Sequence, residues 1–295
     1  NKGTLNLVGS NNQTVSGDVG VGNALKDVNS GVTGTTSTFN GTVNSQNVTN
    51  TGTGATTFQD NVTATNVNVN AGTSTFQDNL TATTTTITTG TGNFNTVSGT
   101  TTSNLQFTDN GTANLNNGLT GNVTTTADNK GTLNLVGSSN QTVTGPVGAS
   151  GASLAEVNAG ANGSTSTFAN DVYATNTNIG SGRVDFNTVS GITNTNIIFT
   201  DNGTANLLNG LTGNIDFAGK DATVNVSDGK GILGSVQTLA SNNTGIINYQ
   251  GDGTISGNSI NSGASGIKEL NINTANQQNS GGPGLVIGYT ALARE

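Results

Sequence analysis

The chain has no cysteine, histidine, methionine or tryptophan among its 295 residues, and only two prolines. Disulfides, thiolate nucleophiles and thiolate metal ligands are therefore excluded, and so is the commonest general base. Charged residues make up 8% of the chain and aromatic residues 4%, and the net charge is −8 without any basic run. This balance excludes nucleic acid and anionic membrane surfaces as main partners. No apolar run reaches the roughly 18 residues that insertion into a bilayer requires.

Threonine, asparagine and glycine dominate instead, and phenylalanines recur among them at a nearly constant interval. Such spacing predicts a solenoid, in which each coil of backbone brings one residue over its predecessor. Two further apolar columns keep the same interval. The predicted core ladder consists of Phe39, Phe58, Phe76, Phe94, Phe168, Phe186, Val62, Leu80, Val172, Val69, Ile87 and Ile179.

Short stretches of alternating residues, such as TLNLV from Thr4, are typical of β-strands, and Asn-Gly pairs separate them. We therefore predict an all-β parallel β-helix (β-solenoid), with coils of about 18 residues, three short strands per coil and about sixteen coils. Stacked Asn or Thr side chains are expected to hydrogen-bond along the axis. The alternatives are an antiparallel meander built on Asn-Gly hairpins and a disordered Thr/Asn/Gly-rich stalk. The constant register of the apolar columns favours the β-helix.

Longer duplications indicate three internal repeats, starting near residues 1, 129 and 219. NKGTLNLVGS occurs at Asn1 and again at Asn129, whereas TDNGTANL at Thr108 returns already at Thr200. The second repeat is thus shorter than the first, and the loss equals two coils. We expect a repetitive β-helix over 1–273, an irregular end or cap segment over 274–295, and a longer precursor of which this chain is a fragment.

Several of these segments resemble the passenger region of rickettsial surface cell antigen autotransporters of the outer membrane protein A and B group. The similarity lies in KGTLNLVGS, in QTVTGPVGA and SLAEVNAG between Gln141 and Gly160, in the STF coils, and in NGLTGNIDFAGKDATVNV from Asn209. The resemblance implies an exposed or secreted passenger at the bacterial cell surface or outer membrane, used in host-cell adhesion and in coating the bacterium. It also implies a translocator β-barrel in the full-length precursor.

The resemblance leads to two functional hypotheses. The first is an adhesin-like role in which the passenger contacts a host-cell surface protein, and the second is a structural coat or spacer layer without a specific receptor. Repeat proteins usually bind through their extended surface. The irregular stretches 10–37, 138–163 and 233–265 are the candidate binding loops, and sequence drift without function is the alternative explanation for them.

Catalysis and cofactors are not expected. β-Helical polysaccharide-degrading enzymes use clustered carboxylates with cations or histidine, but the eight lysines and arginines are scattered along this chain. An ice-binding solenoid needs a regular threonine array, and the Thr-x-Thr pattern at Thr63 and Thr81 does not persist.

Asp60 and Asp78 are weak calcium candidates, because each follows a column phenylalanine by two residues. Stacking would place them one coil apart, roughly 5 Å, within reach of one ion. The alternative is that each aspartate caps its own turn by accepting hydrogen bonds from local amides.

Overall fold

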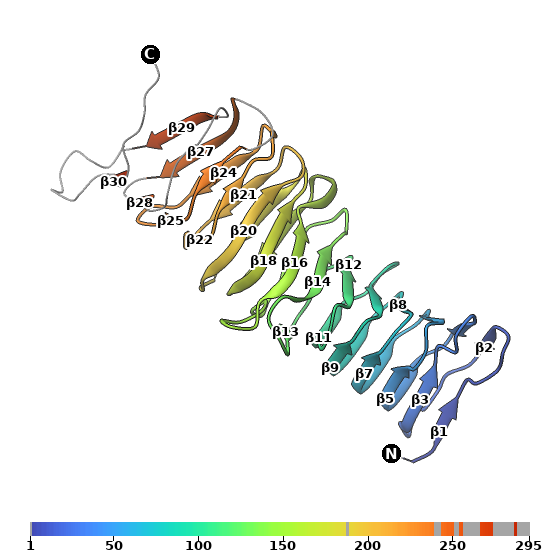
Figure 1. The fold of residues 1–295 in the computed structure, drawn as a ribbon. Helices are drawn as coiled ribbons and strands as arrows, with labels where there is room; N and C mark the ends of the chain where they lie inside the picture. Colours follow the sequence, from blue (N-terminus) through green and yellow to red (C-terminus); the bar gives the residue numbers. More distant parts are fainter. Residues whose placement is uncertain are drawn as a thin grey trace. The chain divides into compact units, whose positions relative to one another are not determined.

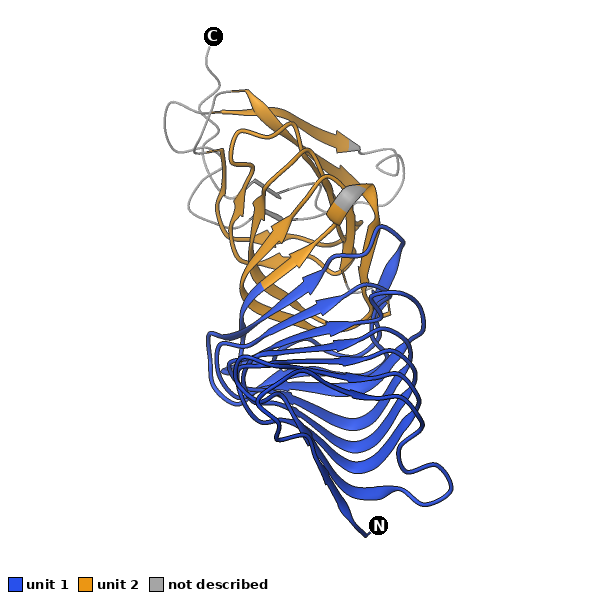
Figure 2. Ribbon diagram, turned by 90° about the vertical axis from the view of Figure 1, so that its right-hand side faces the viewer, with its two compact units in different colours: residues 1–156 blue, residues 157–295 orange. Residues whose placement is uncertain are grey.

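The computed structural model describes residues 2–186, 189–238, 243–250, 254–255, 266–273 and 286–287. These residues form a parallel β-solenoid of about twelve coils with about 20 residues each. Their only helical element is the 3₁₀ turn Ala161–Gly163. The chain divides into two compact units, residues 1–156 and 157–295 (Figure 2).

Unit 1 stacks its strands into two parallel sheets (Figure 1). One sheet contains, in spatial order, β1 (Thr4–Asn6), β3 (Leu25–Ser30), β5 (Val43–Asn50), β7 (Val62–Val69), β9 (Leu80–Ile87), β11 (Thr101–Phe107) and β13 (Val123–Thr125). The other contains β2 (Gln13–Val15), β4 (Thr36–Phe39), β6 (Ala55–Phe58), β8 (Thr73–Phe76), β10 (Thr91–Phe94), β12 (Thr112–Leu115) and β14 (Lys130–Leu135). The short strand β15 (Gln141–Val143) follows, and β16 (Leu154–Ala159) lies at the unit boundary.

Unit 2 repeats this arrangement. One sheet contains β17 (Thr165–Phe168), β19 (Arg183–Phe186), β21 (Thr204–Leu207), β24 (Thr223–Val226), β27 (Thr244–Gln250) and β29 (Ile267–Asn273). The second contains β18 (Val172–Ile179), β20 (Thr193–Phe199), β22 (Leu211–Thr212), β25 (Ile232–Leu233), β28 (Thr254–Ile255) and β30 (Val286–Ile287), with β23 (Ile215–Asp216) and β26 (Val236–Gln237) beside it.

The predicted core columns lie inside the coils, because alternate residues of each strand point inward. All twelve residues of the predicted ladder are at most 1% exposed. Phe58 lies directly over Phe76, and their rings stack with centroids 5.0 Å apart. Val62 pairs with Leu80 in the same register. Each fully buried side chain of this size contributes about 1.5–3 kcal/mol through the hydrophobic effect.

Polar ladders run along the axis, as the composition predicts. Asn134 donates through Nδ2 to Oδ1 of Asn114 at 2.7 Å, and Asn114 donates in the same way to Asn93 at 2.8 Å. Inside the coils, the hydroxyls of Thr85 and Ser103 lie 2.8 Å apart. The asparagine ladder occupies outward-facing, partly exposed positions of its strands, whereas the bond between Thr85 and Ser103 satisfies hydroxyls buried among the apolar columns.

The coil length of about 18 residues predicted from the phenylalanines roughly matches the structure, but the coils are not all of one length. Thr91 pairs with Thr73 in the preceding coil and with Thr112 in the following one, so the second of these coils is the longer. The first coil is longer still, since Thr4 pairs with Asp27. The additional residues lie in turns, which do not contribute to the core. The described residues form about twelve coils, and not the sixteen expected for the whole chain, because the coils are longer and part of the chain lies outside the described ranges.

Two of the three strands expected per coil are joined into one long strand. In β11 the pairing shifts register between Thr102 and Asn104, which marks the bend. In unit 2 the same long strand, β20, is opposed by two separate strands, β22 and β23.

The repeats are not whole numbers of coils. The second copy of KGTLNL lies in the thirteenth strand after the first, an odd displacement, so β1 pairs with β3 in one sheet whereas β14 pairs with β12 in the other. The predicted loss of two coils is confirmed. Six strands lie between β4 and β11 in the first repeat, whereas two strands, β18 and β19, lie between the corresponding β17 and β20.

The three candidate loops contain strands as well as turns. Residues 10–37 contain β2 and β3, and residues 138–163 contain β15 and β16. In 233–265, the strands β26, β27 and β28 alternate with residues that lie outside the described part of the chain. Of the predicted cap 274–295, only the two residues of β30 are described.

Candidate interaction site

One turn of unit 2 is much shorter than its neighbours. Only three residues, 208–210, connect the buried Leu207 to the buried Leu211. In the preceding coil six residues separate Phe186 from Thr193, and in the following coil five separate Val226 from Ile232. The short turn therefore leaves a hollow between two longer ones.

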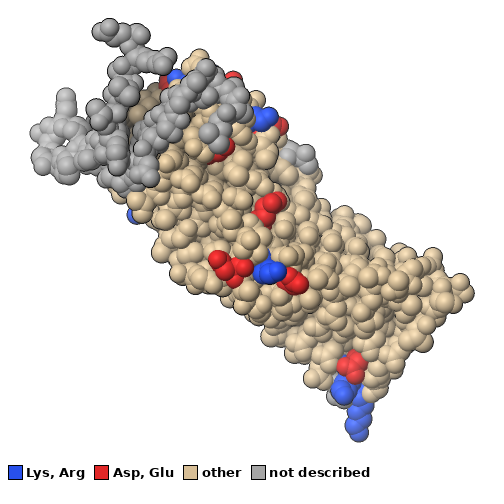
Figure 3. Space-filling model, in the orientation of Figure 1, with Lys and Arg blue, Asp and Glu red and all other residues tan. Residues whose placement is uncertain are grey.

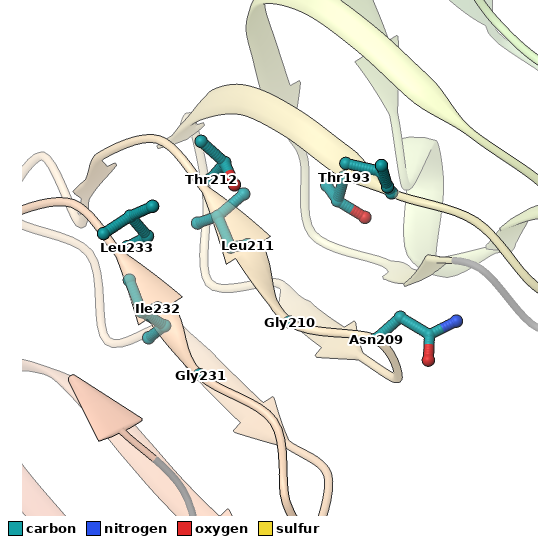
Figure 4. Close-up of a pocket in the computed structure, with 9 residues that line it drawn as sticks. Thr193, Asn209, Gly210, Leu211, Thr212, Gly231, Ile232 and Leu233 are labelled. Carbon is teal, nitrogen blue, oxygen red and sulfur yellow. The ribbon is translucent and has the colours of Figure 1, made fainter. Parts of the chain in front are cut away.

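The hollow has a volume of about 350 Å³ and is lined by residues of three consecutive coils (Figure 4). Leu211 and Ile232 are buried beneath it, while Ile192 and Leu233 at its rim are 51% and 56% exposed. The lining residues are Ile192, Thr193, Asn209, Gly210, Leu211, Thr212, Gly231, Ile232 and Leu233. We call this site the Ile192 hollow.

Two glycines keep the Ile192 hollow open. Gly210 has φ of +84°, which favours glycine, and a Cβ at this position would lie 2.6 Å from the carbonyl oxygen of Gly231. Gly231 adds no side chain from the following coil. The exposed side chains of the rim therefore border open space.

Unit 1 contains the same three-coil arrangement with polar residues in its place. Counting from the shared motifs NTVSG, NGLTGN and the strand after KGTLNL, Ile192 corresponds to Thr100, Leu208 to Asn116 and Leu233 to Thr144. Each of these polar side chains forms a hydrogen bond. The hydroxyl of Thr100 donates to Asn79, Asn116 Nδ2 donates to the carbonyl of Phe94, and the hydroxyl of Thr144 accepts from the amide of Gly121.

The space beside the short turn of unit 1 is also occupied. Gln141, 2% exposed, donates through Nε2 to the carbonyl of Asn116 at 2.9 Å. The corresponding residue of unit 2 is Lys230, which is not among the lining residues of the hollow. Three polar residues have thus been exchanged for apolar ones, and the side chain over the short turn has been exchanged as well. Ile192 and Leu233 line the hollow, and Leu208 and Lys230 each precede a lining residue, Asn209 and Gly231.

The sequence contained a signal for this site that periodicity alone does not detect. TDNGTANLNNGLTGN and TDNGTANLLNGLTGN differ only at Asn116 and Leu208, and Leu208 is 37% exposed. Exposed leucine in place of asparagine opposes the trend of surface composition. Comparing the copies residue by residue finds the position, whereas the search for columns finds only the core.

Among the residues that the structure describes, charged groups are not gathered into any comparable site. Figure 3 shows only small groups of charged side chains on the face it displays. The ion pairs of the described residues join Lys130 to Asp109 at 2.8 Å, Arg183 to Asp185 at 2.7 Å and Lys268 to Asp221 at 3.3 Å. The hydrogen bond from Lys130 lowers the pKa of Asp109, and the Asp185 carboxylate raises the pKa of Arg183. The lysine pairs lie at the surface and are of small energetic value, whereas Asp185 is buried and accepts two hydrogen bonds from Arg183.

Asp60, one of the two weak calcium candidates, caps its turn in the way the alternative explanation predicts. Its Oδ1 accepts hydrogen bonds from the backbone amide of Asn61 at 2.7 Å and from the Asn61 side chain at 2.8 Å. At the second candidate, the backbone carbonyl of Asp78 accepts from Asn95 at 3.0 Å. Within the described ranges, no three acidic residues gather into a group suited to a metal ion.

One exposed threonine column continues further than the sequence indicates. Thr63 pairs with Thr81, Thr81 with Thr102, and Thr102 with Thr120. The neighbouring outward position changes from threonine to Asn104 in the third of these coils. The Thr-x-Thr pattern of an ice-binding face needs two neighbouring columns of threonine, and only one column continues here.

No family model matches this chain, and no curated protein or solved structure is significantly similar to it. In the part of the chain that the structure describes, no helix is of sufficient length and hydrophobicity to span a bilayer. The arguments for function therefore rest on the solenoid and on the Ile192 hollow.

Proposed function

We propose that this chain is a non-catalytic surface passenger with an adhesin-like role, and that the Ile192 hollow contacts a host-cell surface protein. The observation that carries the proposal is the exchange of hydrogen-bonded polar residues for exposed apolar ones around a single hollow. Exposed apolar side chains gain free energy only when a partner covers them. The polar copy in unit 1 indicates that the fold itself does not require them.

The chemistry of the hollow favours a protein ligand. Its buried part offers Leu211 and Ile232, its rim offers Ile192 and Leu233, and no carboxylate or cation lines it. An aliphatic or aromatic side chain of a partner would be desolvated there, as is usual at the centre of protein interfaces. The hydroxyls of Thr193 and Thr212 and the amide of Asn209 offer hydrogen bonds at the same place.

A structural coat or spacer layer is the second candidate function. The loss of two coils in the second repeat favours it, because the stacked strands tolerate this change of length. A coat depends on the number of coils and not on particular surface residues. A variant with altered surface residues and a variant with fewer coils therefore distinguish the two functions.

Binding of protein-coated beads to cultured mammalian cells separates them. In the first variant, Ile192→Thr, Leu208→Asn and Leu233→Thr introduce the residues of unit 1, which fit the same backbone. In the second, residues 57–92 are deleted, which removes two coils. We expect the triple variant to lose most of the binding, at least tenfold for three contacts of about 0.5–1 kcal/mol each, and the deletion to keep it.

The matched control is Val97→Thr, which removes an exposed valine, 73% exposed, from the turn of unit 1 that precedes Thr100. It should bind as the parent protein does. Equal binding by the triple variant and the parent would contradict a role for the Ile192 hollow. Absence of any binding above bare beads would favour the coat.

A further inference from the structure

The short turn of the Ile192 hollow contains a reactive pair of residues. Asn209 is followed by Gly210, and both line the hollow. Asparagine before glycine is prone to spontaneous deamidation, because glycine has no Cβ to hinder the approach of its backbone nitrogen to the preceding side chain. In Figure 4 the Asn209 side chain extends away from Leu211 and Ile232. Its carboxamide is therefore not packed against the apolar floor of the hollow.

Unit 1 contains the same pair in a restrained form. Asn117–Gly118 corresponds to Asn209–Gly210, and Gly118 and Gly210 have nearly the same φ, +88° and +84°. Asn117 donates through Nδ2 to the carbonyl oxygen of Gly99 at 3.1 Å. This bond restricts rotation of the carboxamide, whose carbon must approach the nitrogen of Gly118 before the two can react.

The described part of unit 2 contains no such restraint at Asn209. Among the described residues, neither the carboxamide of Asn209 nor the backbone amide of Gly210 forms a hydrogen bond. The counterpart of Gly99 is Gly191, whose φ is +119° and not +88°. The Asn209 carboxamide can therefore turn toward the nitrogen of Gly210, and the hollow gives water access to both groups.

A second Asn-Gly pair of unit 2 is held at both of its reacting groups. The backbone amide of Gly203 donates to the carbonyl oxygen of Asp201 at 2.9 Å. The side-chain oxygen of Asn202 accepts from the backbone amide of Asp221 at 3.0 Å. Asn209 is therefore the less restrained of the two asparagines, although sequence alone does not distinguish them.

We propose that Asn209 deamidates spontaneously in the folded protein. The Gly210 nitrogen loses its proton to hydroxide and forms a bond to Cγ of Asn209, and the side-chain nitrogen takes a proton from water and leaves as ammonia. Water then opens the succinimide at either of its two carbonyl groups, which gives aspartate or isoaspartate. Either product places a carboxylate at a hollow that no charged residue lines.

The consequence for binding rests on the proposed function of the hollow. A carboxylate loses favourable hydration when an apolar partner covers it. Isoaspartate also adds one carbon to the main chain of a turn that has only three residues, 208–210. Deamidation of Asn209 therefore lowers the affinity of the Ile192 hollow for an apolar partner as the protein ages.

Peptide mapping by mass spectrometry tests the modification itself. The full chain is incubated at mildly alkaline pH, and deamidation is followed over time at Asn209, Asn202 and Asn117. We expect Asn209 to react at least about fivefold faster than Asn117, the factor that corresponds to one hydrogen bond of ordinary strength. In guanidinium chloride, where that bond is lost, the two rates should become equal.

Asn209→Gln is the matched control, because glutamine keeps the carboxamide but would have to close a larger ring. The peptide that contains this substitution should stay unmodified at position 209. Equal rates at Asn209 and Asn117 in the folded protein would overturn the proposal, and so would the absence of deamidation at Asn209.

Binding of coated beads to cultured cells measures the consequence. Aged parent protein should lose most of its binding, aged Asn209→Gln should bind as fresh protein does, and Asn209→Asp should show the loss without ageing. Unchanged binding after deamidation of Asn209 would overturn the effect on the hollow. Fresh protein that binds no cells would overturn the proposed function, whereas the mass-spectrometric result does not depend on binding.

Discussion

One core column of unit 1 changes its character along the solenoid. From β4 to β10 it contains four phenylalanines, whose neighbouring rings lie 5.0 to 5.4 Å apart and within 12° of parallel. Beyond Phe94 the same column continues with Leu115 and Leu135, which are equally buried. The coils between stacked rings are also shorter than the coils that place leucine in the column. Their strands begin in register at Thr36, Ala55, Thr73 and Thr91 within the stack, and at Thr112 and Thr132 beyond it.

The constant number of residues per coil is therefore a property of the coils whose rings stack, and not of the solenoid as a whole. Where rings stack, one coil resembles the next over its whole length, including the turns. Where leucine follows, the backbone ladder still holds the register while the turns vary. Unit 2 shows the same change, from the stacked Phe168 and Phe186 to Leu207, Val226 and Tyr249 in successive coils.

Replacing a phenylalanine in the middle of the stack should have the largest effect on the free energy of unfolding. Phe76→Ala leaves a cavity between Phe58 and Phe94, and we expect it to lower the free energy of unfolding by about 3–5 kcal/mol. Phe76→Leu introduces the residue of the later coils and should cost less, about 1–3 kcal/mol, because it forfeits mainly the two ring contacts. Urea denaturation measures both variants. Equal losses would mean that the stack adds nothing beyond burial.

An intermediate effect on stability is expected at the buried hydroxyl pair of Thr85 and Ser103. Thr85 lies between Val67 and Leu105 in an apolar column, and its hydroxyl bonds to Ser103. Thr85→Val should destabilise unit 1 by about 1 kcal/mol, since the Ser103 hydroxyl loses its 2.8 Å partner and keeps only the 3.4 Å bond to the carbonyl of Asn104. Adding Ser103→Ala should restore most of that loss. A double variant as unstable as the sum of both single variants would contradict a coupling between the two hydroxyls.

The smallest effect on stability at neutral pH is expected at Tyr249. This residue follows Leu207 and Val226 in the core column of unit 2 described above. It is 1% exposed, and its hydroxyl forms no hydrogen bond of good geometry with the described residues, the backbone of Ile232 being its polar neighbour. Burial raises the pKa of this phenol above its usual value near 10. The unfolded chain therefore releases the proton first as the pH rises, and the stability that the neutral phenol provides below pH 10 is lost above it.

Tyr249→Phe should change stability by less than about 1 kcal/mol at pH 7, because no hydrogen bond is broken. Above pH 10 the variant should be more stable than the parent, and the difference should grow with pH. Unfolding measured between pH 8 and pH 11 checks this. Parallel curves for the two proteins would mean that Tyr249 ionises as readily in the folded protein as in the unfolded chain.

The sequence was sufficient to predict the class of fold and its interior. Stacked Phe58 and Phe76 and paired Val62 and Leu80 follow directly from the interval, because inward residues must match their neighbours. Turn residues are under no such constraint, so the coil lengths around Thr112 were not predictable from the columns. The joining of two strands in β11 was missed for the same reason, since a bend with a register shift has no distinctive composition.

The candidate site was not predicted, although its residues were visible. Ile192 and Leu233 look like further apolar strand residues until the backbone shows which side they face. Gly210 and Gly231 look like ordinary turn glycines until they are seen side by side in consecutive coils. The hollow depends on how residues of consecutive coils lie next to one another, and the residue types alone do not reveal it.

The displacement of the second KGTLNL copy by an odd number of strands affects how the protein is recognised from outside. Val8 and Val136 follow the same strand in the two copies and are 74% and 40% exposed, yet their strands belong to different sheets of unit 1. An antibody against this segment would therefore meet its epitope on two sheets of a single unit. The duplication has therefore placed the same short sequence in two different sheets of one unit.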